Sequence, residues 1–116
     1  LDIRPDVGQK IPEELRNRVN LVTSSLSASR DTLESLLARQ PLIMLHDSDH
    51  SYENTRFELG LAKEFGIPIV VVDDADYNLG FLEWTRSDDY LFFYLQTRRK
   101  LIGVAAASDF VSKPCV

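Results

Sequence analysis

Several features are scarce in this chain of 116 residues, and each scarcity excludes a class of protein. A single cysteine, Cys115, cannot form an internal disulfide, which is typical of a reducing compartment. Lys and Arg number 13 against 18 Asp and Glu, so the net charge is −5 and nucleic acid phosphates and anionic membranes are not attracted. No apolar run approaches the roughly 18 residues of a membrane span, and no signal peptide is visible. We therefore expect a cytoplasmic protein that binds neither nucleic acid nor membranes.

The composition is otherwise that of a folded protein. Hydrophobic residues make up 44% and charged residues 27% of the chain, which excludes a disordered segment. The length suits one small domain. There are no repeats and no convincing linker, so we expect a single domain over residues 1–116.

Apolar runs alternate with helical patterns along the chain. Residues 41–46 and 67–72 are continuous apolar runs of strand length, which are typical of strands covered on both faces. Between them, residues 52–65 carry large apolar residues four apart, which predicts a helix. Those residues are Phe57, Leu61 and Phe65. The same criteria predict a strand end at 1–4, a helical turn at 13–18, a strand at 19–22 and helices at 30–39 and 78–85.

The alternation of strands and helices predicts an α/β fold with a largely parallel sheet. The last two strands, at residues 90–95 and 101–106, are separated by only five residues. A connection that short normally joins antiparallel neighbours. We therefore expect the chain to close its sheet with a hairpin.

Acidic residues follow both buried strands. Asp47 comes after the first strand, and Asp73 and Asp74 come after the second. In an open α/β sheet, ligands bind at the carboxyl ends of the strands. Three carboxylates gathered there would repel one another unless a cation compensates, and oxygen ligands suit Mg, Mn or Ca. The alternative is that these acids cap the following helix and stay solvated, in which case Asp47 or Asp49 simply favours the positive end of the helix that starts near Tyr52.

Other residues near these acids could carry chemistry. His50 is a candidate general base, because the pKa of histidine lies near neutral pH, or else a hydrogen-bonded loop histidine. His46 ends a buried strand and is expected to make a structural hydrogen bond. Asp47 and Asp49 form an Asp-x-Asp pattern, a short metal motif that glycosyltransferases also carry. Aromatic residues near the last strands could line an acceptor pocket, but they are more often core: Phe81, Trp84, Tyr90, Phe92, Phe93 and Tyr94.

The combined pattern resembles a known superfamily over about residues 42–84. It consists of Leu42-Ile-Met-Leu-His-Asp-Ser-Asp-His-Ser-Tyr-Glu-Asn, then Phe57-Glu-Leu, then Pro68-Ile-Val-Val-Val-Asp-Asp-Ala, then Asn78-Leu-Gly-Phe-Leu-Glu. This is similar to the fourth and fifth strand region of class I S-adenosylmethionine-dependent methyltransferases. Within them it most resembles the small-molecule O-methyltransferases related to cephalosporin hydroxylase and macrocin methyltransferase.

The resemblance implies a role for each matching residue. Asp47, Asp73 and Asp74 match the carboxylates that hold a divalent cation such as Mg²⁺, and His50 falls where relatives place a base. Upstream, residues 1–5 resemble the end of the second strand, and residues 19–23 the third. Three residues would then contact S-adenosylmethionine. Asp2 would bind the ribose, and Ser24 and Ser25 would lie near the adenine.

The resemblance also has a gap. The family's glycine-rich loop follows its first strand, and the five glycines of this chain, at 8, 60, 66, 80 and 103, form no such loop. That first strand sits in the family between the second and fourth strands. The chain is therefore expected to be a fragment, to receive the strand from another molecule, or to have rearranged its sheet.

We expect a Rossmann-like methyltransferase sheet that lacks its first strand and glycine-rich loop. The expected function is a truncated or degenerate, metal-dependent O-methyltransferase acting on a small-molecule hydroxyl. The alternatives are a non-catalytic binding or assembly module, or a glycosyltransferase-like fragment. An open sheet edge favours a homodimer or a partner chain that covers it.

Overall fold

The computed structural model describes residues 9, 11–18, 30–87 and 90–112. The chain divides into two compact units, Leu1–Ser35 and Leu36–Val116. The single domain expected over the whole chain therefore stays a prediction. The strands expected at residues 1–4 and 19–22 lie outside the described residues.

Two helices precede the sheet. The 3-10 helix η1 (Glu13–Arg18) lies in the first unit and confirms the expected helical turn. The amide of Leu15 donates to the carbonyl of Pro12 at 2.9 Å, so proline opens the turn without losing a donor. Helix α1 (Arg30–Leu37) confirms the helix expected from residue 30, although it ends two residues earlier than predicted.

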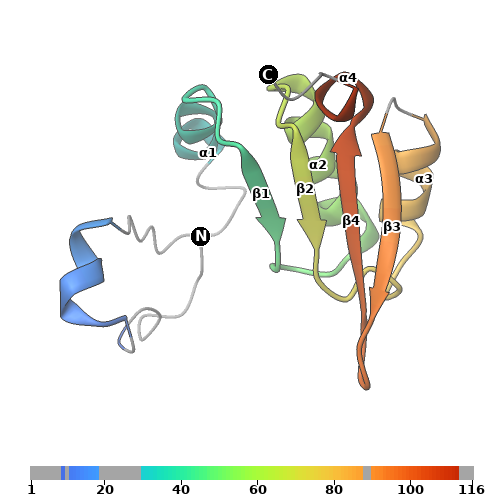
Figure 1. The fold of residues 1–116 in the computed structure, drawn as a ribbon, viewed down its shortest axis with the longest axis horizontal. Helices are drawn as coiled ribbons and strands as arrows, with labels where there is room; N and C mark the ends of the chain where they lie inside the picture. The colour runs from blue at the N-terminus through green and yellow to red at the C-terminus, as the bar shows by residue number, and fades with distance from the viewer. Residues whose placement is uncertain (1–8, 10, 19–29, 88–89, 113–116) are drawn as a thin grey trace. The chain divides into compact units, whose positions relative to one another are not determined.

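The second unit is a mixed α/β fold built on a four-stranded sheet (Figure 1). Its strands stand in the order β1-β2-β4-β3. Strands β1 and β2 are parallel, and β4 runs antiparallel to both of its neighbours. The closing hairpin and the parallel pair β1–β2 are thereby confirmed, whereas the expectation of a largely parallel sheet is wrong, because two of the three described strand pairings are antiparallel. The elements in chain order are β1 (Ile43–His46), α2 (Tyr52–Glu64), β2 (Ile69–Val72), α3 (Gly80–Ser87), β3 (Tyr90–Gln96), β4 (Leu101–Ala107) and α4 (Ser108–Val111).

Helix α2 starts and ends where its sequence signals lie. The Ser51 hydroxyl accepts from the amide of Asn54 at 3.3 Å, which is an N-cap. Gly66 just past the end adopts φ 64°, a conformation that glycine reaches without steric cost. The predicted apolar stripe is partly wrong, because Phe57 and Phe65 are only half-buried. The buried residues of the helix are Thr55, Glu58, Leu59, Leu61 and Ala62.

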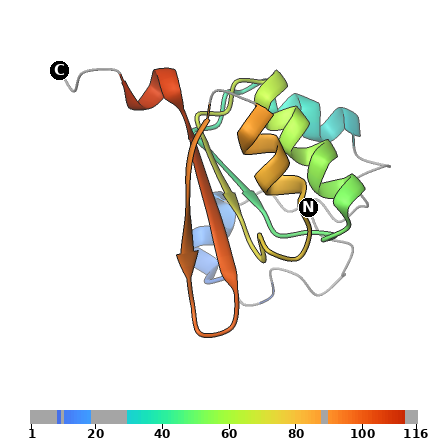
Figure 2. The same ribbon diagram turned by 90° about the vertical axis from the view of Figure 1, so that its right-hand side faces the viewer.

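Helices α2 and α3 cover the same face of the sheet, as Figure 2 shows. Phe81 of α3 is 1% exposed and packs edge-on against Phe92 and Tyr94 of β3. Trp84 lies one turn further along, with its ring centroid 4.4 Å from that of Tyr90. Five of the six aromatic residues considered for an acceptor pocket thus contact one another within the helix-covered layer.

The opposite face of the sheet is apolar throughout. Alternate residues of every strand point there, since successive side chains of a strand point to opposite faces. Leu45 is 63% and Phe93 55% exposed, so the cover expected on both faces is not seen among the described residues of this unit. The face, which we call the open sheet face, consists of Ile43, Leu45, Ile69, Val71, Leu91, Phe93, Leu95, Ile102, Val104 and Ala106. Among the helices that the structure describes, none is long and apolar enough to cross a membrane.

Candidate metal centre

Three possible metal ligands meet where β1 and β2 end. Register pairs His46 with Val72 in the parallel strands, so Asp47 and Asp73 leave the sheet side by side. His50, from the loop before α2, joins them. One ligand atom of each of Asp47, His50 and Asp73 lies within 4.8 Å of the other two. Two carboxylates and an imidazole form a donor set that suits a divalent cation such as Mn²⁺, and the two carboxylates alone also suit Mg²⁺.

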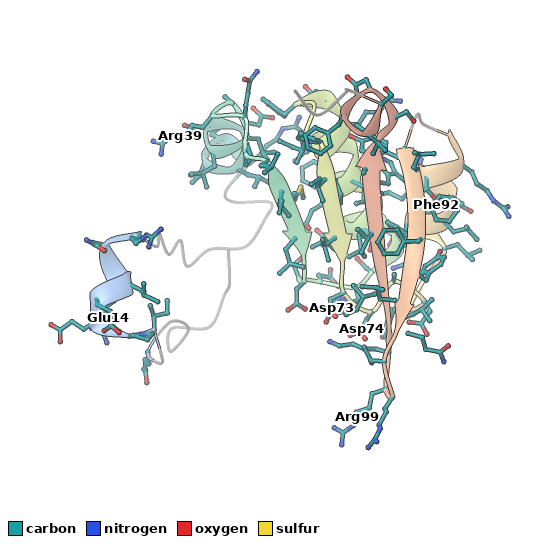
Figure 3. All side chains as sticks on the ribbon, viewed as in Figure 1. Glu14, Arg39, Asp73, Asp74, Phe92 and Arg99 are labelled. Carbon is teal, nitrogen blue, oxygen red and sulfur yellow. The ribbon has the colours of Figure 1, made fainter. Side chains whose placement is uncertain are left out.

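Asp74 lies beside this group and contacts its histidine. Its carboxylate Oδ2 is 3.3 Å from Nε2 of His50. Asp74 adopts φ 48°, an uncommon conformation for a residue with a side chain. Figure 3 shows Asp73 and Asp74 together at this end of the sheet. The sequence grouped Asp74 with the metal carboxylates, whereas the structure places it against His50.

The second ring nitrogen of His50 suits a cation. Nδ1 is buried and has no hydrogen-bond partner among the described residues. If Nε2 carries the proton and donates it to Asp74, Nδ1 keeps a lone pair that faces no donor. A metal-bound histidine commonly donates its other ring N–H to a carboxylate, which orients the ring. The residues present therefore fit a divalent cation.

A lysine from the hairpin also reaches this group. The ammonium of Lys100 forms an ion pair with Asp73 Oδ2. This hydrogen bond raises the pKa of Lys100 above its ordinary value, against a smaller opposing effect of desolvation, and the charges of Asp73, Asp74 and Asp47 raise it further. The amide of Ala75 donates to the carbonyl of Leu101 at 2.8 Å, which ties the turn after β2 to the start of β4.

A buried hydrogen-bond network supports the loop that carries Asp47 and His50. His46, 1% exposed, pairs through Nδ1 with Glu58 on α2. Ser48 donates to the other oxygen of Glu58 at 2.7 Å, and Asn54 donates to it at 3.3 Å. Burial alone would raise the pKa of Glu58, but the hydrogen bonds from His46, Ser48 and Asn54 and the charge of His46 together lower it. The expected structural hydrogen bond of His46 is confirmed.

Asn78 fixes the loop from the other side. Its amide donates to the carbonyl of His50 at 2.8 Å and to the hydroxyl of Thr55 at 3.1 Å. Its side-chain oxygen accepts from the amide of Gly80, the first residue of α3, at 2.7 Å. One side chain therefore connects the His50 loop, α2 and α3. Together these groups line a small pocket made by His46, His50, Thr55, Val72, Asp73, Asp74, Ala75, Asn78 and Phe81.

The other predicted site residues fall elsewhere. Asp49 accepts from the amide and the hydroxyl of Ser51, both at 3.0 Å, so it shapes the turn before α2. It does not belong to the three-residue group. The residues predicted to contact S-adenosylmethionine, Asp2, Ser24 and Ser25, lie outside the described residues.

Sequence reasoning missed Glu58, Asn78 and Lys100 as parts of this site. Glu58 could have been found, because it stands three residues after Thr55 and next to Leu59 on the buried face of α2. A carboxylate on such a face needs a partner. Lys100 carries no comparable signal, since only the insertion of β4 beside β2 brings it near Asp73.

Compared with known protein families, curated proteins and solved structures, the chain matches none of them.

Proposed function

We propose that this chain is part of an S-adenosylmethionine-dependent O-methyltransferase that uses a divalent cation to bind a small-molecule hydroxyl. The observation that carries the proposal is the meeting of Asp47, His50 and Asp73 at the carboxyl ends of two parallel neighbours. Those strand ends are where open α/β sheets bind ligands. The proposed sheet is Rossmann-like, and β1 is its edge on the side where the family places its first strand.

Each residue has a proposed role. A bound divalent cation would lower the pKa of the acceptor hydroxyl. Asp47 and Asp73 would hold the cation through their carboxylates. Asp74 would orient the His50 ring, and the unpartnered Nδ1 favours His50 as a ligand over the alternative of a general base. Asn78 would keep the His50 backbone in place.

Isothermal titration with Mn²⁺ tests the cation site and separates it from the glycosyltransferase alternative. We expect Asp47→Asn and Asp73→Asn each to weaken Mn²⁺ binding by about tenfold or more, the effect of losing one charge next to a divalent ion. Asp49→Asn is the matched control, because Asp49 has the same charge but is held by Ser51. His50→Gln assigns the histidine: weaker binding makes it a ligand, and unchanged binding leaves it the base.

The opposite pattern would contradict the proposal. If Asp49→Asn removed Mn²⁺ binding and Asp73→Asn did not, the motif would be the Asp-x-Asp pair of a glycosyltransferase. If the folded protein bound no Mn²⁺, the metal-dependent function would be wrong.

The open sheet face favours a second candidate, a non-catalytic assembly module. None of its ten residues is charged or polar, so no charged partner is complementary to it. Contiguous apolar patches of this kind mark interfaces. A second copy of the chain would bring an identical apolar face, which is how two-fold interfaces form. In this candidate the carboxylates of Asp47, Asp73 and Asp74 would be inherited remnants with no catalytic role.

A further inference from the structure

The candidate metal centre already contains a positive charge. The ammonium of Lys100 pairs with Asp73, one of the three proposed ligands. The carboxylate of Asp73 is mostly buried, with its side chain 15% exposed, whereas the side chain of Lys100 is 39% exposed. The side chain of Lys100 therefore has room to move into solvent, whereas Asp73 is held among its neighbours.

The backbone of Lys100 is held independently of that ion pair. Its carbonyl accepts from the amide of Thr97 at 2.9 Å and from the Thr97 hydroxyl at 3.0 Å, and its amide donates to the same hydroxyl at 3.1 Å. These bonds close the turn between β3 and β4. Only the side chain of Lys100 needs to move for Asp73 to become free.

We infer that Lys100 is the resident counter-cation of this centre, and that its ammonium leaves Asp73 when a divalent cation binds. This inference rests on the proposed function. Lys100 thereby limits cation affinity: without metal its ammonium offsets part of the negative charge of the site, and an incoming ion must displace this covalently attached cation from Asp73. Divalent ions displace the ammonium more readily than monovalent ions do, because their attraction to the same carboxylates is twice as large.

Titration of three variants with Mn²⁺ tests the inference. Lys100→Met removes the competing charge and is expected to tighten Mn²⁺ binding by about tenfold, because the ion pair between Lys100 and Asp73 no longer has to open. Arg99→Gln is the matched control, since it removes the same charge one residue away. Figure 3 shows Arg99 at the tip of the hairpin, pointing away from Asp73. Lys100→Arg keeps the charge and is expected to keep the affinity.

A second measurement needs no substitution. In the NMR spectrum of the unaltered protein, the Lys100 Nζ signal is expected to shift towards that of a solvated ammonium when Mg²⁺ is added. This result would show directly that the ion pair opens.

Three results have distinct meanings. Tighter binding in Lys100→Met than in the unaltered protein and in Arg99→Gln supports the inference. Equal or weaker binding in Lys100→Met, or an unmoved Nζ signal while Mg²⁺ binds, overturns it and leaves the cation site standing. Absence of binding in the unaltered protein and in folded Lys100→Met overturns the inference and the metal-dependent function together.

Discussion

At the residue scale, Glu58 determines how firmly the site loop is held. Its two carboxylate oxygens accept from His46, Ser48 and Asn54, which belong to β1, the following loop and α2. A carboxylate buried among donors is stabilised in its charged form only while every donor stays in place. The loop that carries Asp47 and His50 therefore depends on a carboxylate of α2.

The lowered pKa of Glu58 makes this stabilisation dependent on pH. A carboxyl whose pKa is lower in the folded than in the unfolded state, here below 4.5, stabilises the fold above that unfolded value and loses its effect as pH falls through the folded one. We expect Glu58→Gln to reduce the free energy of unfolding by about 2 kcal/mol at pH 7. The difference should shrink steadily below pH 4.5. Urea unfolding of the unaltered protein and of Glu58→Gln at several pH values measures the loss of stability and its dependence on pH.

Glu53→Gln is the control for this prediction, because Glu53 is an exposed carboxyl on the same helix. Glu53→Gln should change the free energy of unfolding by less than about 0.5 kcal/mol both at pH 7 and at pH 3.5. A Glu58→Gln effect that was the same at pH 7 and pH 3.5 would contradict the network as described.

At the element scale, α3 packs closely against β4. A Cβ on Gly103 would lie 2.5 Å from Cε1 of Phe81, whose ring is buried and packed between other aromatics. Gly103→Ala is therefore expected to destabilise the fold by about 1–3 kcal/mol, the usual cost of overpacking. Thermal unfolding measures the change.

Gly60→Ala provides the comparison. Gly60 lies on the exposed side of α2, and an added Cβ would meet nothing within 4 Å. Alanine is the better helix former, so this change should be neutral or stabilising by up to about 1 kcal/mol. If Gly103→Ala were as harmless as Gly60→Ala, the packing of α3 on β4 would be wrong.

The elements also show what the sequence can and cannot predict. The parallel pair β1 and β2 and the hairpin β3–β4 follow from local apolar runs and from the length of the connections. The meeting of Asp47 with Asp73 follows in turn, because both come directly after neighbouring parallel strands. The position of β4 between β2 and β3 has no local signal, and with it the contact of Lys100 with Asp73 stays hidden. The contact of Asp74 with His50 depends on a left-handed backbone at Asp74, which the sequence does not indicate.

At the scale of the whole molecule, the described sheet has one covered and one open face. Helices α2 and α3 complete one layer (Figure 2), whereas the open sheet face and the edge strand β1 are available to a further element or to another chain. The methyltransferase and the assembly module share this architecture. They differ in whether a cofactor binds near the carboxylates at the ends of β1 and β2.

Isothermal titration of the folded chain with S-adenosylhomocysteine, with and without Mg²⁺, tests that difference most directly. The proposed methyltransferase predicts binding at micromolar strength in the presence of Mg²⁺. No heat of binding under either condition, from a chain shown by circular dichroism to be folded, would contradict the methyltransferase and leave the assembly module.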